Sequence, residues 1–258
     1  MGQGAPLVIL HGLFGTLDNW QTLARRWADA GHRVLSVDLR NHGRSFHTEE
    51  HSYSLMAQDV LALFDHLGLD PSTTTLLGHS MGGKTAMRFA LDNPGRLARL
   101  VVVDIAPGHS DMHHQDNILA GLNAVPLTTL ENRQQADEAL ARHIPQPGVR
   151  QFLLKNLYRQ DDNSFAWRQN LTALTRHLAE IGAEINGAQP FLKPALFIRG
   201  GKSDYVTTED KLYHIPALFP NSQVETVVDA GHWVHAEKPD EVFALVQAFI
   251  DSSQAARV

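Results

Sequence analysis

The sequence predicts a protein of the α/β class with a mostly parallel sheet. Short apolar runs alternate along the chain with longer segments whose apolar residues recur at helical spacing, a pattern typical of strands buried on both faces of a parallel sheet. The alternation stops between residues 108 and 190, where amphipathic stretches occur without a strand-like run. Because a structureless loop of that length is implausible in a folded domain, we expect an inserted helical cap there. Residues 1–107 and 191–258 would then form the core.

The first part of the core contains predicted strands and helices in alternation. Buried strands are predicted at residues 7–10, 34–37, 74–77 and 100–103. The spacing of apolar residues predicts the helices between them at residues 20–30, 55–67 and 81–93. Helices therefore join successive strands, as parallel pairing requires.

The cap and the end of the chain follow. Amphipathic stretches at residues 134–143 and 171–185 predict cap helices. Further strands are predicted at residues 195–198 and 224–228. A last helix is expected to begin near Pro239, because proline suits a first helical turn and the acidic residues that follow complement the helix dipole.

Composition excludes several classes of function. The 258 residues are 43% hydrophobic and 19% charged, and carry a net charge of −6 with no basic block, which argues against nucleic acid or an anionic membrane as a main partner. There is no cysteine, so disulfides, thiolate metal sites and a cysteine nucleophile are excluded. No apolar run approaches the ~18 residues of a membrane span, and no basic segment precedes the first apolar run. We therefore expect a cytoplasmic location.

The strongest local motif is Gly-x-Ser-x-Gly at residues 78–82. It lies between a predicted buried strand and a predicted helix, where a sharp turn would expose the hydroxyl of Ser80. Ser80 would also lie at a helix N-terminus, which favours developing negative charge. The alternative is an ordinary turn with a surface serine. The strand before the motif and the helix after it favour a nucleophile.

A serine hydroxyl needs a base, and His232 is the candidate. It follows the last predicted strand, and Gly231 would permit the tight turn that brings its ring toward Ser80. A histidine in such a loop is more often structural than catalytic. Its position downstream of a nucleophile motif favours the catalytic interpretation.

The chain resembles the α/β-hydrolase superfamily over almost its whole length. The resemblance rests on His-Gly-Leu-Phe-Gly at residues 11–15, Asp-Leu-Arg-Asn-His-Gly-Arg-Ser at residues 38–45, the serine motif, and Gly231 with His232. More narrowly, it is similar to the YbfF-like bacterial esterases, through residues 13–20, 82–84, 104–107 and 231–239.

This resemblance implies hydrolysis of carboxylic esters with short to medium acyl chains, and of acyl thioesters such as acyl-CoA, through an acyl-Ser80 intermediate and without a cofactor. The partner would be a small-molecule substrate. Hydrolases of this kind usually have one or two strands before the His-Gly loop. Because few residues precede Leu7, we expect those edge strands to be short or missing and the sheet to have about six strands.

Two acids follow Ser80 and precede His232 in the permitted order, Asp104 and Asp204. Most members of the superfamily take the acid from a Gly-x-x-Asp-x-x-Val pattern, but anchoring that pattern on Val206 puts Ser203 in the acid position. Asp204 then lies one residue after the acid position of the pattern, and a shift of one residue near a strand end turns the side chain to the opposite direction. Asp104 ends the strand after the nucleophile helix, at the carboxyl edge of the sheet. We favour Asp104, as the YbfF-like resemblance also implies, and keep Asp204 as the alternate.

An oxyanion hole needs two donors, which in this architecture are backbone N–H groups. Met81, directly after Ser80, would supply one. The resemblance implies Leu13 as the other, with Phe14 as a less favoured choice. His11 and His79 would be structural histidines that hold loops beside the site. Of the 15 histidines in the chain, a few others would anchor loops within the motifs named above, and the rest would lie on the surface.

Other features leave alternatives open. His109, His113 and His114, with Asp111 and Asp116 nearby, could suggest a metal site, but nothing fixes its geometry, so we expect a solvated helix face and no metal. Trp233 and His235 either line the pocket or pack under the last helix. The cap aromatics would divide between cap core and acyl pocket; they are Phe152, Tyr158, Phe165 and Trp167.

Rival functions within the superfamily are a C–C bond hydrolase and a cofactor-free perhydrolase. Enzymes that use an aspartate nucleophile are disfavoured by Ser80. A rival from another class is a ligand-binding receptor with residual hydrolysis. The sequence leaves the natural substrate, the acyl length, the cap's mobility and the oligomeric state open.

Overall fold

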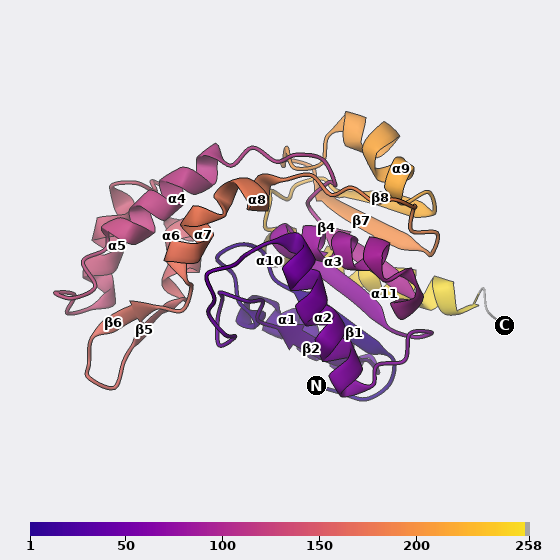
Figure 1. Cartoon of the computed structure of the whole chain (residues 1–258), viewed down its shortest axis with the longest axis horizontal. Helices are drawn as coiled ribbons and strands as arrows, with labels where there is room; N and C mark the ends of the chain where they lie inside the picture. The colour runs from indigo at the N-terminus through magenta and orange to yellow at the C-terminus, as the bar shows by residue number, and fades with distance from the viewer. Residues whose placement is uncertain (256–258) are drawn as a thin grey trace.

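The computed structural model describes residues 1–255 and is built on a six-stranded, wholly parallel sheet (Figure 1). The strands occur in the order β2-β1-β3-β4-β7-β8. Their bounds are β1 Pro6–Leu10, β2 Arg33–Val37, β3 Thr75–His79, β4 Arg99–Val103, β7 Ala195–Gly200 and β8 Ser222–Val227. All six strands that the sequence predicts are confirmed, and only their ends shift by one or two residues.

Alternate residues of the central strands face two separate layers of helices, which explains why these strands are apolar throughout. On β1, Leu7 and Ile9 join the core packed against α1 (Gln21–Asp29) and α11 (Pro239–Ala255). Val8 and Leu10 join the opposite core, with α2 (Tyr53–Leu67) and α3 (Met81–Asp92). The parallel order puts the carboxyl ends of the strands at one edge, where the loops after β1, β3, β4 and β8 meet.

The segment between β4 and β7 pairs with none of the six strands and lies to one side of them (Figure 1). It contains five helices and one two-stranded hairpin. These are α4 (His113–Ala124), α5 (Arg133–Ala141), α6 (Pro147–Leu154), β5 (Leu157–Arg159), β6 (Phe165–Trp167), α7 (Leu171–Arg176) and α8 (Leu178–Gly182). The hairpin is absent from the sequence prediction, because strands of three residues are too short to show a period.

Short elements complete the chain: η1 (Leu17–Trp20), η2 (Pro94–Arg96), η3 (Asp210–His214), α9 (Ile215–Leu218) and α10 (Val234–Glu237). Among the described residues, no helix combines the length and apolarity needed to cross a membrane.

Candidate active site

Ser80 lies in the sharp turn between β3 and α3. Its φ of 53° and ψ of −118° are a strained conformation for a residue other than glycine. Its N–H donates to the Val103 carbonyl at 3.0 Å, and its own carbonyl accepts from the Lys84 N–H at 3.0 Å. The turn is therefore fixed by the neighbouring strand on one side and by the first turn of α3 on the other.

The two glycines of the motif are required by close backbone approach. A Cβ on Gly78 would lie 2.1 Å from the Gly82 carbonyl oxygen, and a Cβ on Gly82 would lie 2.5 Å from the His11 carbonyl oxygen. No side chain fits at such distances. The motif is thus a packing requirement of the turn that presents Ser80.

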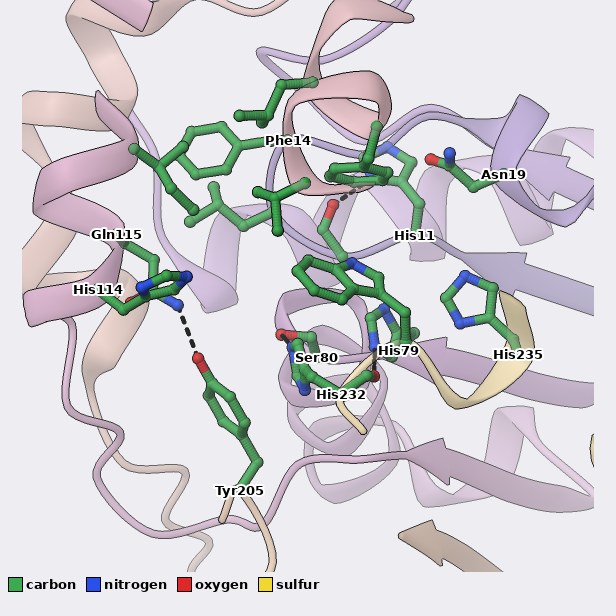
Figure 2. Close-up of a pocket in the computed structure, with 18 of the residues that line it drawn as sticks. His11, Phe14, Asn19, His79, Ser80, His114, Gln115, Tyr205, His232 and His235 are labelled. Carbon is green, nitrogen blue, oxygen red and sulfur yellow. Dashed lines mark hydrogen bonds between the residues drawn. The ribbon is translucent and has the colours of Figure 1, made fainter. Parts of the chain in front are cut away.

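His232 lies in the loop between β8 and α10, with Nε2 3.1 Å from Ser80 Oγ (Figure 2). Its ring stacks on that of Tyr205, with centroids 4.0 Å apart. Its carbonyl accepts a hydrogen bond of 2.8 Å from His79 Nε2. A stacked ring and a bonded backbone together limit the orientations that the imidazole can adopt.

Asp104 completes the chain of contacts from the end of β4. His232 Nδ1 is 2.8 Å from Asp104 Oδ2, and the Asp104 side chain has no exposed surface. The carboxylate also accepts from the Gly200 N–H at 2.7 Å and from the Ser203 hydroxyl. Because a carboxylate accepts only, His232 carries its proton on Nδ1, which leaves Nε2 free to accept from Ser80.

The alternate acid, Asp204, is exposed and lines a neighbouring groove. Within the described residues no hydrogen bond joins it to His232. Ser203, in the position where the common pattern places the acid, instead donates to Asp104. The structure thus brings Ser80, His232 and Asp104 together and leaves Asp204 outside.

The loop after β1 turns beside Ser80 and carries Leu13 and Phe14, the two candidates for the second oxyanion donor. The Gly12 carbonyl accepts from His11 Nδ1 at 2.8 Å and from the Gly15 N–H at 2.9 Å. The Gly12 carbonyl and the Leu13 N–H belong to one trans peptide, in which the two groups point in opposite directions. The Leu13 N–H therefore points away from His11 and Gly15. Over residues 1–255, the N–H groups of Leu13 and Met81 meet no acceptor, whereas that of Phe14 donates to His42 Nε2. This difference favours Leu13 over Phe14.

A cavity of about 760 Å³, including its open mouth, contains Ser80 and His232 (Figure 2). Its apolar part includes Phe14 and four residues of the inserted segment, Ile118, Val149, Phe152 and Leu153. Its other part contains polar but uncharged groups, among them Asn19, His79 and His235 (Figure 2). No Lys, Arg, Asp or Glu of the described chain lines it.

Several histidines around the site are buried, and burial holds them neutral. It lowers the pKa of His11 to about 4 and that of His235 to about 3, and it holds the pKa of His79 well below its usual range. His11 and His79 bond neighbouring loops, as expected. The prediction that the histidines outside the recognised motifs lie on the surface is wrong for two of them, His32 and His51. A polar residue gives no sequence signal of burial when its partners are distant in the chain.

Trp233, His235 and the aromatic residues of the inserted segment take different positions. Trp233 and His235 line the cavity, and His235 also stacks on Trp20 with centroids 4.2 Å apart. Among the cap aromatics, Phe152 reaches the cavity and Tyr158 is half-buried. Phe165 and Trp167 are in the core of the inserted segment.

The histidine cluster of the inserted segment has no metal-binding geometry. His113 is 90% exposed and lies 3.9 Å from both Asp111 and Asp116. In the described part of the chain, no three residues of the metal-ligating types gather closely enough to hold an ion.

The sequence and the structure were both compared with known proteins, and both comparisons find α/β hydrolases or esterases. The sequence profile of the alpha/beta hydrolase fold matches residues 5–239. The chain is 42% identical over 250 residues to the sn-1-specific diacylglycerol lipase ABHD11 of Mus musculus, covering 95% of this chain and 80% of that one. It is 39% identical over 248 residues to Esterase YbfF of Escherichia coli (strain K12), covering 96% and 93%. A solved structure called Marine microorganism esterase superposes with a TM-score of 0.92 at 36% identity, covering 96% of both chains.

Proposed function

Because this chain belongs to the alpha/beta hydrolase fold family, we propose that it is a serine carboxylic ester hydrolase acting through an acyl-Ser80 intermediate. The observation that carries the proposal is the continuous chain of contacts from Ser80 Oγ through His232 to the buried carboxylate of Asp104, at 3.1 and 2.8 Å. A nucleophile, a base and an acid that orients the base are the parts that acyl transfer needs. The esterase and lipase names of its relatives point to the same reaction.

In the proposed acylation step, Ser80 Oγ bonds to the ester carbonyl carbon while its proton passes to His232 Nε2. The negative charge that develops on the carbonyl oxygen is stabilised by the N–H groups of Leu13 and Met81. His232 then returns the proton to the leaving oxygen, and the alcohol departs. Asp104 stabilises the imidazolium through Nδ1 during the step.

Deacylation repeats the sequence with water. Water loses a proton to His232 Nε2 and attacks the acyl carbon, and the second tetrahedral intermediate uses the same two N–H donors. Its collapse releases the carboxylic acid and returns the proton to Ser80. No cofactor takes part in either step.

The cavity favours a neutral substrate with a short or medium apolar chain. No Lys, Arg, Asp or Glu of the described residues lines the cavity, and Phe14 with the four apolar residues of the inserted segment provides surface for the chain. The groove next to it contains three aspartates, Asp111, Asp204 and Asp210. An acyl-CoA, whose leaving group carries several negative charges, meets an unfavourable potential there. Thioesters with a neutral leaving group do not.

We further propose that residues 108–190 are a cap and that residues 1–107 and 191–258 are the core. The support is that β5 and β6 pair only with each other, and that the cavity is lined from both parts. A cytoplasmic location stays a prediction.

The test is a set of p-nitrophenyl esters of rising acyl length, a neutral N-acetylcysteamine thioester and the matching acyl-CoA, each assayed with the wild type and Ser80→Ala. We expect Ser80-dependent turnover of the esters, and a kcat/KM at least tenfold higher for the N-acetylcysteamine thioester than for the acyl-CoA at low salt. Equal values for the two thioesters would contradict the preference for neutral substrates. Absence of Ser80-dependent turnover on every compound would contradict hydrolysis, and support the C–C hydrolase, perhydrolase or receptor alternatives.

A further inference from the structure

Two buried amide side chains of the inserted segment converge on one carbonyl of the loop beside Ser80. The Phe14 carbonyl accepts from Asn156 Nδ2 at 2.8 Å and from Gln169 Nε2 at 3.2 Å. Asn156 is 2% exposed and Gln169 is 3% exposed. The two residues lie at the base of the β5–β6 hairpin, where the Arg168 N–H donates to the Asn156 carbonyl at 2.9 Å. The amides are therefore held as a pair.

Neither amide oxygen has a partner within the described residues, although both oxygens are buried. An unpaired buried acceptor costs free energy, which an apolar side chain of similar size would avoid. Packing alone therefore does not account for these two amides. What they provide is N–H groups directed at the Phe14 carbonyl, and Asn156 Nδ2 also donates to the Leu153 carbonyl at 3.3 Å.

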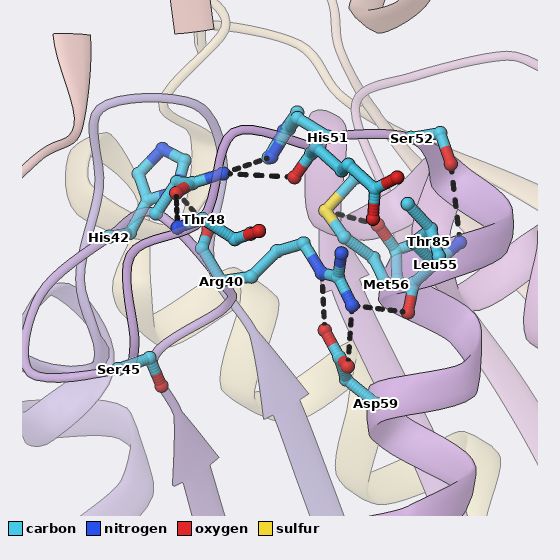
Figure 3. Close-up of polar contacts among 12 residues, drawn as sticks. Arg40, His42, Ser45, Thr48, His51, Ser52, Leu55, Met56, Asp59 and Thr85 are labelled. Carbon is cyan, nitrogen blue, oxygen red and sulfur yellow. Dashed lines mark hydrogen bonds and ion pairs between the residues drawn. The ribbon is translucent and has the colours of Figure 1, made fainter. Parts of the chain in front are cut away.

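Phe14 is also held through its N–H, by His42 Nε2 at 3.3 Å. His42 Nδ1 donates to the Arg40 carbonyl at 3.0 Å, so the proton is on Nδ1 and Nε2 is an acceptor. Figure 3 shows His42 beside Arg40, which is paired with Asp59 at 2.6 Å. Burial lowers the pKa of His42 to about 3, so it stays a neutral acceptor.

These contacts hold a turn that would otherwise relax. Phe14 has a φ of 60°, in the left-handed region that favours glycine. It is the third residue of the turn closed by the hydrogen bond from the Gly15 N–H to the Gly12 carbonyl, and Leu13 is the second. Rotation at Phe14 would move the Leu13 N–H, because both belong to this four-residue turn.

We propose that Asn156 and Gln169 are positioning residues for ester hydrolysis, which hold the Phe14 carbonyl so that the Leu13 N–H faces the oxyanion. The inference rests on the proposed function, since it assigns these residues a part in stabilising its transition state. The inserted segment thereby contributes to the chemical step as well as to the cavity wall.

The experiment compares Asn156→Leu, Gln169→Met and the double variant with the wild type. We expect each single change to lower kcat for a p-nitrophenyl ester about five- to twentyfold and the double change about a hundredfold, with KM changed less than threefold, because the lost interaction acts in the transition state. The inhibition constant of a trifluoromethyl ketone with the same acyl group should rise by the same factor as kcat/KM falls. This ketone bonds to Ser80 Oγ and places an oxyanion in the hole.

Asn170→Ser is the matched control. Asn170 lies next to Gln169 and also joins the inserted segment to the core, through the Asn41 side chain at 3.1 Å and the Thr48 carbonyl at 3.0 Å. Serine is too short for those contacts but keeps a cap for α7. This variant should lose thermal stability because those contacts are lost, while its kcat and ketone affinity should change less than twofold.

Three results would overturn the inference. The first is a double variant whose kcat and ketone affinity equal those of the wild type. The second is a double variant that loses kcat without a parallel loss of ketone affinity. The third is an Asn170→Ser variant that loses as much kcat and ketone affinity as the double variant. If Asn156→Leu does not fold, Gln169→Met and Asn156→Asp give the same readouts. If no ester is turned over by the wild type, the proposed function fails, and the inference is tested by the rate at which a fluorophosphonate labels Ser80, which uses the same oxyanion site.

Discussion

Asp104 occupies a position that the structure prepares for a negative charge. Three donors converge on its carboxylate, from Gly200, Ser203 and His232, and one of them is a backbone N–H that no substitution of side chain removes. Its own φ of 50° is in the left-handed region, which directs the side chain off the end of β4 toward His232. A strained conformation is retained where the surrounding contacts outweigh its cost.

We expect Asp104→Asn to lower kcat about 10⁴-fold, because an amide can present N–H to His232 and stabilise the wrong tautomer. Asp204→Asn should leave kcat within twofold, since Asp204 is exposed and does not contact His232. Steady-state kinetics on one ester, beside the melting temperature of each variant, tests the pair. The reverse order of effects would assign the acid to Asp204.

Sequence reasoning could select Ser80 and His232 as candidates, because each lies in a local motif at a strand end. It could also narrow the acid to two residues by chain order and register. It could not find Asn156 or Gln169, because an amide that bonds a carbonyl 142 or 155 residues away leaves no local pattern. The same holds for the hydrogen bond from Ser203 to Asp104.

Helix α3 connects Ser80 to the inserted segment through one buried lysine. Lys84 is 1% exposed, one helical turn after Ser80. Its Nζ donates to the carbonyls of Gly108, Gly182 and Ala183 at 2.8, 3.2 and 2.7 Å. These three carbonyls belong to the two stretches by which the chain leaves and re-enters the core.

Replacing Lys84 should therefore release both stretches at once. We expect Lys84→Met to lower the free energy of unfolding at pH 7 by about 2–4 kcal/mol, because the carbonyls of Gly108 and Ala183 lose their donor and that of Gly182 keeps only the Ser110 N–H. Denaturant titration of both proteins measures the difference. An unchanged free energy of unfolding would show that the carbonyls find other partners.

The same pair of proteins tests the protonation of this lysine. Burial lowers the pKa of Lys84 from 10.5 to about 8, so between these values the unfolded chain binds a proton that the folded chain has released. The stability of the wild type relative to Lys84→Met should thus rise from pH 8 toward pH 10.5. A difference that stays constant or falls over this range would contradict the lowered pKa.

For the whole molecule, the buried histidines predict sensitivity to acid. Burial lowers the pKa of five of them, His11, His42, His51, His79 and His235, from the ordinary value of 6.5. Below pH 6.5 the unfolded chain therefore binds more protons than the folded chain. Their contribution to stability is complete above pH 6.5 and is lost as the pH falls toward 4 and 3.

We expect the free energy of unfolding to fall by roughly 3–7 kcal/mol per pH unit below pH 6, at about 1.4 kcal/mol for each histidine that titrates. His51→Gln should reduce that slope by about 1.4 kcal/mol per pH unit, the contribution of one proton, since burial lowers the pKa of His51 to about 3. Unfolding curves at pH 7, 6 and 5 give the slopes. Identical slopes for the two proteins would exclude His51 from the acid response.

The architecture of the core could be predicted almost completely, because strands buried on both faces are apolar at every position and helices between them keep a clear period. The inserted segment was predicted less well. Its helices are short, its hairpin has three residues on each strand, and several of its contacts with the core are hydrogen bonds of polar side chains to distant residues. Such elements depend on tertiary contacts that no sequence window contains.

The two junctions of the inserted segment are joined directly to each other. The Ser110 N–H donates to the Gly182 carbonyl at 2.8 Å, and the Ile185 N–H donates to the Pro107 carbonyl at 2.7 Å. A chain that leaves and returns at adjacent points can exchange everything between them without changing the strand order of the sheet. A different inserted segment could therefore replace this one as a unit and change the lining of the cavity while Ser80, His232 and Asp104 stay in place. The hydrogen bonds that Asn156 and Gln169 make to Phe14 set a condition on such an exchange, because a replacement segment would have to supply its own donors to that carbonyl.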